Sequence, residues 1–293
     1  MIYSIIIPHK NTPELLKRCI DSIPCREDTE IIIVDDCSDS SIVNFDNFPC
    51  NERKDVRIFL NNKPIGAGPA RNLGIKEARG EWIIFSDSDD YFTTKLPIIM
   101  DKYAEKGNVD MVIWNAKSIN EYGVVGSLSL NLYIKNYFRN REYSLSTLKY
   151  HFWAPWSRMI KKKILIDNNI EFENVPFGND KKGILTASIA AKVVAVEKDF
   201  VYIYWKPTYG SQTHLKHNTK SKDQILLIIN QTLYVNRLYK EVNYPFLWPI
   251  TIPKGISRDD PKLIQLLQEY NYSSLQNIFN KIKYIIAKLL KLI

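Results

Sequence analysis

The sequence predicts an α/β fold with a mainly parallel central sheet flanked by helices, followed by a C-terminal helical extension. Short apolar runs alternate with helix-like segments over about the first 115 residues, which is typical of parallel strands joined by crossover helices. Hydrophobic residues make up 45% and charged residues 25% of the 293-residue chain, so it can build an ordinary core. This length suggests about two domains, or one large domain with an appendage.

The first strand is expected at residues 4–7, where an apolar run ends at Pro8. A helix should follow, because Thr12 can cap a helix whose first residue is Pro13. A second helix is expected from about residue 69 to residue 79, before a glycine. The other strands of this half are expected at residues 31–34, 56–60, 82–85 and 111–114.

The pattern is weaker beyond residue 116. Residues 160–170 resemble a helix with a basic start, and a further helix is expected at 183–192. The apolar run at 200–204 predicts a strand, and residues 220–240 predict a helix.

Each predicted strand of the first half ends in or beside polar residues. The first four are followed by Pro8–Asn11, Asp35–Asp36, Asn61–Asn62 and Asp87–Asp90. Because parallel strands all point the same way, these clusters should gather at one edge of the sheet, where open α/β sheets bind their ligands. The sequence therefore predicts a single polar crevice.

The segment Asp87-Ser88-Asp89-Asp90 follows a run that should be a buried strand. Carboxylates at such a strand end repel one another and lose hydration, and a divalent cation would relieve both effects. That cation would in turn attract a phosphate. The alternative is that one of these residues caps the next helix while the other acids are solvated.

The net charge of +8 fits a nucleotide, a nucleic acid or an anionic membrane as a partner and does not choose between them. The four cysteines have no C-x-x-C pair and no zinc-like spacing with histidine, so free thiols in a reducing cytosol are expected. No signal peptide or membrane-spanning stretch is recognisable, which predicts a cytoplasmic protein. No nucleic-acid-binding motif occurs, so nucleic acid is not expected as a partner.

Residues 278–293 predict a basic amphipathic helix. Its isoleucines and Leu289 share one side of a helical wheel, and four lysines flank or oppose that side. Two interpretations stay open: the helix contacts a membrane surface, or it docks on its own domain with its lysines in water.

Four blocks in about the first hundred residues occur in the order and spacing of a known family. They are Pro8-x-x-Asn11, Val34-Asp35-Asp36-x-Ser38, Ala70-Arg71-Asn72-x-Gly74-Ile75 and the run from Ala78 to Asp90. With them the chain resembles a family 2 glycosyltransferase of the GT-A fold. Two later blocks match more loosely: Trp156–Lys161 resembles the stretch before the acceptor helix, and Phe177–Asp180 resembles the Gly-Glu-Asp element.

The resemblance implies that residues 1–115 bind the nucleotide sugar, residues 116–216 form the acceptor half of the same domain, and residues 217–293 form the helical extension. Asp35 or Asp36 would accept a hydrogen bond from the nucleotide base. The full set implied for donor binding is Pro8, Asn11, Asp35, Asp36, Asn62, Arg71, Asp87 and Ser88.

The resemblance also implies a metal and a base. Asp89 would bind Mn²⁺ or Mg²⁺, with Asp87 and Asp90 as further ligands, and the metal would stabilise charge on the leaving nucleoside diphosphate. His214 is a further candidate ligand, although a lone histidine is more often exposed or satisfied within the fold. Asp180 would be the general base for the acceptor hydroxyl, unless it merely caps the helix that follows.

Two departures from the family pattern bear on these roles. His9-Lys10 stands where an aromatic residue is usual, and Asn179 stands where a glutamate precedes the base. Asp180 nevertheless keeps the carboxylate that a base requires.

The function predicted on this basis is an inverting, metal-dependent glycosyltransferase. It would move a sugar from a nucleotide-diphospho sugar, with a UDP-sugar favoured, to a glycan or lipid-linked acceptor in surface polysaccharide synthesis. Peripheral contact with the inner face of the membrane is expected through residues 278–293. One alternative is a sugar-phosphate nucleotidyltransferase, which would want a glycine-rich loop where this chain has His9-Lys10. The other is a non-catalytic basic module that binds membrane or nucleic acid.

Overall fold

The structure is a computed structural model of the chain. Contacts within the chain define two compact units, Met1–Thr208 and Tyr209–Ile293. The expected division of residues 1–216 into a donor half and an acceptor half stays a prediction. The structure describes residues 1–50, 52–104, 106–175, 178–206, 221–244, 247–248, 250, 260–273, 277 and 280–281, without the side chains of 141–144.

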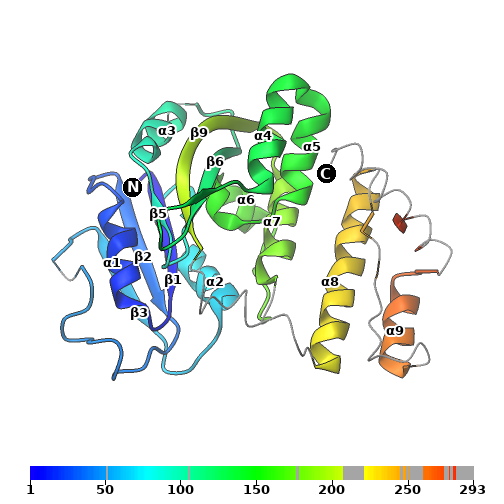
Figure 1. The fold of residues 1–293 in the computed structure, drawn as a ribbon, viewed down its shortest axis with the longest axis horizontal. Coiled ribbons are helices and arrows are strands. Elements are labelled where there is room, and N and C mark those ends of the chain that lie inside the picture. Colours follow the sequence, from blue (N-terminus) through cyan, green and yellow to red (C-terminus); the bar gives the residue numbers. More distant parts are fainter. Residues whose placement is uncertain are drawn as a thin grey trace. The chain divides into compact units, whose positions relative to one another are not determined.

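The first unit is built on a mixed sheet in the order β3-β2-β1-β4-β8-β6-β9-β5, with β7 paired to β6 (Figure 1). Strands β1 to β4 are parallel, and β8 runs antiparallel between β4 and β6, so β6 points the same way as β1 to β4. In chain order the strands are β1 (Tyr3–His9), β2 (Thr29–Asp35), β3 (Val56–Leu60), β4 (Trp82–Phe85), β5 (Tyr91–Phe92), β6 (Met111–Ile119), β7 (Val125–Gly126), β8 (Arg158–Lys161) and β9 (Val194–Trp205).

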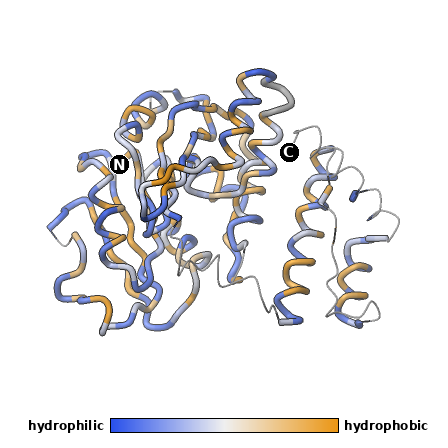
Figure 2. Tube along the Cα trace, viewed as in Figure 1, coloured by the Kyte–Doolittle hydropathy of each residue, from blue (hydrophilic) through white to orange (hydrophobic). Residues whose placement is uncertain are grey.

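The predicted α/β fold is confirmed. Its central strands are apolar on both faces because helices cover the sheet, and Figure 2 shows orange, apolar stretches along them. The register pairs Ile5 with Ile31 on one side and with Ile84 on the other, so apolar side chains meet across neighbouring strands. The polar ends of β1, β2 and β4 therefore lie on the same edge.

Helices connect the strands of this unit, and α4, α5 and α7 lie side by side (Figure 1). Helix α2 packs on β1 and β2, and α3 packs on β9. The helices are α1 (Pro13–Asp21), α2 (Ala67–Glu77), α3 (Lys95–Ala104), α4 (Ser129–Arg139), α5 (Arg141–His151), α6 (Lys162–Asp167) and α7 (Asn179–Ala190), with a short 3-10 turn at Pro155–Ser157.

Two predicted helices differ from the structure. The helix expected at residues 160–170 begins only at Lys162, because Met159 and Ile160 are buried strand residues that pair with β4 and β6. The helix expected from residue 183 begins at Asn179. Gly178 adopts the left-handed conformation, with φ of 62°, and so permits this earlier start.

The loop before α7 lies directly against α2. Gly68 faces the backbone carbonyl of Glu173, and the Glu173 N–H donates to the carbonyl of Asn179 at 3.1 Å. The Asn72 side chain both donates to and accepts from the backbone of Phe172. This loop is therefore fixed to α2, which carries Arg71.

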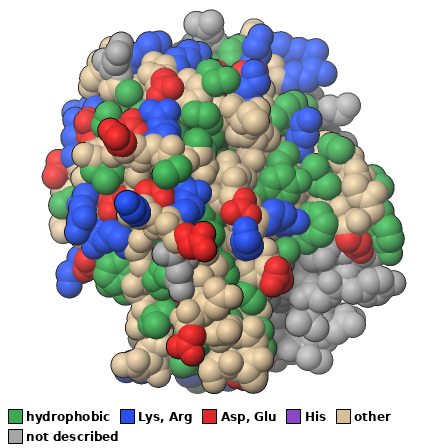
Figure 3. All heavy atoms as spheres, turned by 90° about the vertical axis from the view of Figure 1, so that its left-hand side faces the viewer, with side chains coloured by type: hydrophobic (Ala, Val, Ile, Leu, Met, Phe, Trp, Pro, Cys, Tyr) green, Lys and Arg blue, Asp and Glu red, His purple; other side chains and the backbone are tan. Residues whose placement is uncertain are grey.

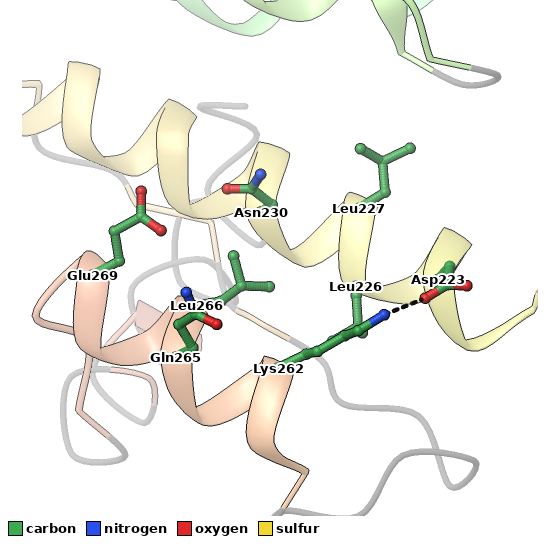
Figure 4. Close-up of a pocket in the computed structure, with 8 residues that line it drawn as sticks. All are labelled: Asp223, Leu226, Leu227, Asn230, Lys262, Gln265, Leu266 and Glu269. Atoms are coloured by element: carbon green, nitrogen blue, oxygen red, sulfur yellow. Dashed lines mark hydrogen bonds and ion pairs between the residues drawn. The ribbon is translucent and has the colours of Figure 1, made fainter.

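The second unit contains α8 (Lys222–Glu241) and α9 (Pro261–Glu269) among its described residues. Helix α8 agrees with the helix predicted at residues 220–240, and Ser221 is its N-cap. Asp260 is the N-cap of α9. A pocket of about 430 Å³ lies between the two helices, and Lys262 pairs with Asp223 at 3.2 Å beside it (Figure 4). It is lined by Asp223, Leu226, Leu227, Asn230, Lys262, Gln265, Leu266 and Glu269.

Two predictions about surfaces can be compared with the structure only in part. Of the helix predicted at 278–293, only Asn280 and Lys281 are described, so its membrane contact stays a prediction. None of the helices within the described ranges is both long and apolar enough to cross a membrane.

On the face drawn in Figure 3, lysines and arginines are interspersed with acids, so that face is not uniformly basic.

We predict that replacing Gly68 with alanine destabilises the first unit. The added Cβ would lie 2.1 Å from the carbonyl oxygen of Glu173, and a backbone atom cannot move aside easily. Overpacking of this kind costs about 1–3 kcal/mol, which lowers Tm by several degrees in calorimetry. Gly107→Ala is the matched control, because nothing lies within 4 Å of its added Cβ. Equal Tm values for the two variants would contradict the prediction.

Candidate active site

A buried histidine–aspartate pair joins the ends of β1 and β2. His9 Nδ1 lies 2.8 Å from Asp35 Oδ2, and His9 Nε2 accepts the backbone N–H of Thr12 at 3.2 Å. Because Nε2 is an acceptor, a neutral imidazole carries its proton on Nδ1 and donates it to Asp35. Burial alone would raise the pKa of Asp35, but hydrogen bonds from His9 and Ser38 hold it below its ordinary value. Asp35, which is 1% exposed, therefore links the ends of β1 and β2 at this edge of the sheet.

The neighbouring residues Asn11 and Asp36 shape the loops around this pair. Asp36 Oδ1 accepts the backbone N–H groups of Ile65 and Gly66 at 2.5 and 2.9 Å, so it holds the turn that begins α2. Asn11, with φ of 56°, accepts the N–H of Asp39 through its side-chain oxygen at 2.8 Å. Both side chains are thus engaged in hydrogen bonds within the protein, and their roles in donor binding stay predictions.

Arg71 connects the acidic segment to Asn179, the residue directly before the predicted base. Its Nη2 donates to Asp87 Oδ1 at 2.6 Å, and its Nη1 donates to the side-chain oxygen of Asn179 at 2.9 Å. The guanidinium also lies 5.6 Å from the centre of the Phe172 ring. Arg71 is only 5% exposed, so its charge depends on these partners. Arg71 therefore brings together Asp87 and Asn179, which are distant in the sequence.

Each residue of the acidic segment Asp87–Asp90 is held by a contact from another part of the chain. The Asp87 N–H donates to Tyr202 Oη at 3.0 Å, and Ser88 Oγ lies 3.2 Å from Thr12 Oγ1. The backbone carbonyl of Asp89 accepts from Arg18 Nη2 at 2.7 Å. The carboxylate oxygen Oδ1 of Asp90 accepts from the Trp205 N–H at 2.7 Å. These contacts come from α1, β9 and the loop after β1. They fix the loop in one conformation without using the Asp89 carboxylate.

The acidic segment is electrostatically crowded. Burial and the neighbouring charge of Asp87 raise the pKa of Asp89 to about 6. Burial, together with the charges of Asp89 and Asp87, raises the pKa of Asp90 well above its ordinary value. The fold therefore holds these carboxylates close together at a cost in stability.

The donor set of this segment fits a hard divalent cation. Within the described part of the chain, no side chain donates a hydrogen bond to the Asp89 carboxylate, and a cation would offset its crowding. No group of three or more His, Cys, Asp or Glu side chains among the described residues forms a ready metal cage. Asp90 is fully buried, and His214 lies outside the described residues. Asp89 and Asp87 are thus the residues best placed to hold Mn²⁺ or Mg²⁺.

Asp180 lies in the first turn of α7, directly after the Asn179 that Arg71 holds. Burial raises the pKa of Asp180; the charge of Arg71 lowers it, and that of Asp87 raises it. A carboxylate with a raised pKa accepts a proton more readily than a carboxylate with an ordinary pKa. The electrostatics of Asp180 therefore suit a general base.

Arg18 and Tyr202 are site residues that sequence reasoning missed. The Arg18 guanidinium lies 4.8 Å from the Tyr91 ring and 4.5 Å from the Trp205 ring while it holds Asp89. Tyr202 stacks on Trp156 and reaches the acidic segment through its hydroxyl. The spacing of the sequence contains no signal for these contacts, because each joins elements that are distant in the chain.

Two predicted donor residues remain, Pro8 and Asn62. Pro8 is half-buried within β1, and Asn62 is exposed after β3 without a side-chain hydrogen bond to any described residue. Its neighbour Asn61 donates to the carbonyl of Asp35 at 3.0 Å instead. The roles of individual residues in binding and catalysis stay predictions.

The fold is that of GT-A glycosyltransferases. Staphylococcus aureus TarS residues 1–349, solved in complex with UDP-GlcNAc, superposes with a TM-score of 0.61 at 19% identity, covering 92% of this chain and 80% of that one. GalNAc-T7, solved with UDP, GalNAc and Mn²⁺, superposes with a TM-score of 0.57 at 13% identity, covering 98% of this chain and 57% of that one. At these identities the likeness concerns the fold alone.

The model of glycosyl transferase family 2 matches residues 4–168, more than half of the sequence, and the chain belongs to that family. It is 30% identical over 210 residues to a poly(ribitol-phosphate) beta-glucosyltransferase of Bacillus spizizenii, covering 70% of this chain and 32% of that protein. It is 26% identical over 256 residues to the poly(ribitol-phosphate) beta-N-acetylglucosaminyltransferase TarP of S. aureus, covering 81% and 73%. The chain spans about a third of the length of the B. spizizenii protein and of TarS.

We predict that Asn179→Asp raises the pKa of Asp180. The new carboxylate would compete for the charge of Arg71, which now lowers that pKa, and would add a like charge beside Asp180. NMR titration of the carboxyl carbons should show Asp180 losing its proton at a higher pH than in the wild type. Asn168→Asp, at the end of α6, adds the same charge elsewhere and should leave the titration unchanged. An unchanged Asp180 in Asn179→Asp would contradict the argument.

Proposed function

We propose that this chain is an inverting, metal-dependent glycosyltransferase. Its donor is a nucleotide-diphospho sugar, with a UDP-sugar favoured, and its acceptor is a hydroxyl of a surface glycan or a lipid-linked precursor. The observation that carries the proposal is the Arg71 bridge. It joins Asp87, on the predicted donor side, to the residue directly before Asp180, the predicted base.

The ligands and names of similar proteins support the chemistry. TarS was solved with UDP-GlcNAc, and GalNAc-T7 with UDP, GalNAc and Mn²⁺. A Pyrobaculum calidifontis mannosyltransferase of similar fold, with a TM-score of 0.52, was solved with GDP-Man and Mn²⁺. The relatives from Bacillus and Staphylococcus are named as poly(ribitol-phosphate) glycosyltransferases. These properties favour a diphospho-sugar donor and a metal for this chain.

The nucleotidyltransferase alternative has less support. That chemistry would use a basic residue after the first strand, yet His9 is 1% exposed and bonded to Asp35. Lys10 lies 3.5 Å from Asp36. Both basic residues at this position are therefore engaged with carboxylates of the protein.

In the proposed reaction Asp180 accepts the proton of the acceptor hydroxyl as its oxygen attacks the anomeric carbon of the donor. The bond between that carbon and the phosphate oxygen breaks, and the nucleoside diphosphate leaves with the bonding electrons. Attack opposite the leaving group inverts the anomeric centre. Arg71 orients Asp87, which would bind the donor, and Asn179, which directly precedes the base at the start of α7. Asp89 and Asp87 would hold the divalent metal, which would supply charge stabilisation for the leaving diphosphate.

We predict that Asp89→Asn abolishes metal-dependent transfer without loss of stability. The amide keeps the shape but removes a charged ligand, so the rate should fall by about two orders of magnitude or more. Tm should stay equal or rise, because the substitution also removes a crowded charge. A thermal-shift panel of UDP-, GDP-, CMP- and dTDP-sugars with and without Mn²⁺ measures donor and metal binding together.

Asp21→Asn is the matched control for this variant, because it makes the same chemical change at an exposed pair with Lys17. It should keep both transfer and the thermal shift with Mn²⁺. Full activity in Asp89→Asn would overturn the metal assignment.

We predict that Asp180→Asn keeps donor binding and loses transfer by at least about 100-fold, the scale of general base catalysis. In the wild type, burial raises the pKa of Asp180, so turnover should increase with pH through this raised pKa and level off above it. The variant should lack that pH dependence. Stopped assays of product and calorimetric titration of the donor measure the two properties separately. Retained turnover would remove Asp180 as the base.

A further inference from the structure

The side-chain amide of Asn179 is held in one orientation by Arg71. Its oxygen accepts from Arg71 Nη1 at 2.9 Å, and a guanidinium has only N–H donors, so the amide nitrogen cannot take that position. The amide nitrogen Nδ2 therefore points away from Arg71. It makes no hydrogen bond with any residue in the described part of the chain, and it is not a buried atom. Its N–H groups are thus available to a ligand.

Asn179 is also fixed through its backbone and its Cβ. Its carbonyl oxygen accepts the N–H of Glu173 at 3.1 Å. Its Cβ packs over Gly68 of α2, where an added Cβ would lie only 3.3 Å away. The amide donors are therefore already in place, and a ligand that used them would not have to order this side chain.

Arg71 determines what lies beside this amide. Its Nη2 donates to Asp87 Oδ1 at 2.6 Å, so adjacent nitrogens of one planar group hold Asp87 and Asn179. The charges of Arg71 and Asp87 both reach Asp180, since the first lowers its pKa and the second raises it. The unpartnered amide donor therefore belongs to the cluster that contains a predicted donor-binding residue and the predicted base.

This cluster has more hydrogen-bond donors than its own acceptors satisfy. Arg71 Nε is buried and has no hydrogen-bond partner among the described residues. The Nδ2 group of Asn179 is a second donor without a partner in that part of the chain. A buried donor that lacks an acceptor lowers stability. A ligand that presents acceptor oxygens here would relieve this deficit.

We propose that the Asn179 amide donates a hydrogen bond to an oxygen of the transferred sugar and so selects that sugar. This inference rests on the proposed function, in which the acceptor hydroxyl attacks the anomeric carbon from the side of Asp180. The diphosphate leaves on the opposite side of that carbon, so the sugar is the part of the donor nearest to the base. A neutral amide suits a neutral sugar oxygen, whereas phosphate sites use cations.

The residue type at position 179 decides the direction of this hydrogen bond. An ionised glutamate, which the family pattern has here, can only accept, whereas the Asn179 amide donates. The partner is therefore a hydroxyl that accepts or an acetamido carbonyl. Similar proteins are named as a beta-glucosyltransferase and a beta-N-acetylglucosaminyltransferase, whose sugars offer these two kinds of oxygen.

The test compares the full chain with Asn179→Asp, which keeps the shape but replaces the amide donors with an acceptor. Calorimetric titrations with Mn²⁺ measure Kd for UDP-GlcNAc, UDP-glucose and UDP. The ratio of Kd for a sugar nucleotide to Kd for UDP should rise about tenfold, the scale of one lost hydrogen bond. A rise for UDP-GlcNAc alone identifies the acetamido carbonyl, and a rise for both identifies a hydroxyl. If the thermal-shift panel selects another nucleotide, its sugar forms replace the UDP compounds.

The controls separate this effect from charge and folding. The added charge would repel UDP, which carries more negative charge than a sugar nucleotide, at least as strongly, so it cannot raise the ratio. Asn179→Ala removes the amide without adding charge and should raise the ratio as well. Asn168→Asp, at the end of α6, should leave it unchanged. Tm of Asn179→Asp should not fall, because the new carboxylate pairs with Arg71 and lies in the first turn of a helix.

An unchanged ratio in both Asn179 variants, including an equal rise of the two Kd values, would overturn the inference and leave the proposed function intact. A wild type that binds none of the nucleotide sugars in the panel would instead refute the proposed function, and the inference with it. Donor analogues that lack one hydroxyl complete a double-mutant cycle. Where the contact is a hydroxyl, the analogue without it should have the same ratio in the wild type and in Asn179→Asp.

Discussion

The Arg71 guanidinium is the interaction on which the arrangement of this site depends. A buried arginine charge is expensive unless it is paired, and Arg71 has two partners on two segments, Asp87 after β4 and Asn179 at the start of α7. Helix α2 cannot shift to relieve this requirement. Gly68 and Gly74 allow the helix to approach Glu173 and Ile6 closely, at positions where any larger residue would collide. Charge pairing and close packing together set the relation between the acidic segment and the start of α7.

The acidic segment is held against its own repulsion. Each of its residues is tied by a neighbour on another element, and the Asp89 carboxylate is left without a side-chain donor in the described region. A loop whose backbone is fixed while its charges are crowded does not need to reorganise when a cation or a phosphate arrives. This is the preorganisation that stabilises developing charge efficiently, and its cost is borne by the large apolar core of the first unit.

Most of the sheet could be predicted from the sequence, because runs such as Ile31–Val34 and Trp82–Phe85 are apolar throughout and have polar ends. The directions of these strands then place Asp35 and Asp87 on one edge. The start of α7 could not be predicted, since it depends on a left-handed Gly178 and on contacts of the preceding loop with α2. Arg18 was missed for a related reason: its partners Tyr91, Trp205 and Asp89 are brought together only by the folded sheet.

The surroundings of Asp180 divide into two sets that act in different ways. Arg71 and Asp87 come from the first half of the chain and carry opposite charges, so their effects on the Asp180 carboxylate oppose each other. Lys181 and Arg158 come from the later segments, and both are cations near the same carboxylate. Burial raises the pKa of Asp180, and the cations limit that rise. For the proposed base, a pKa that burial raises and cations restrain is the balance that general base catalysis favours.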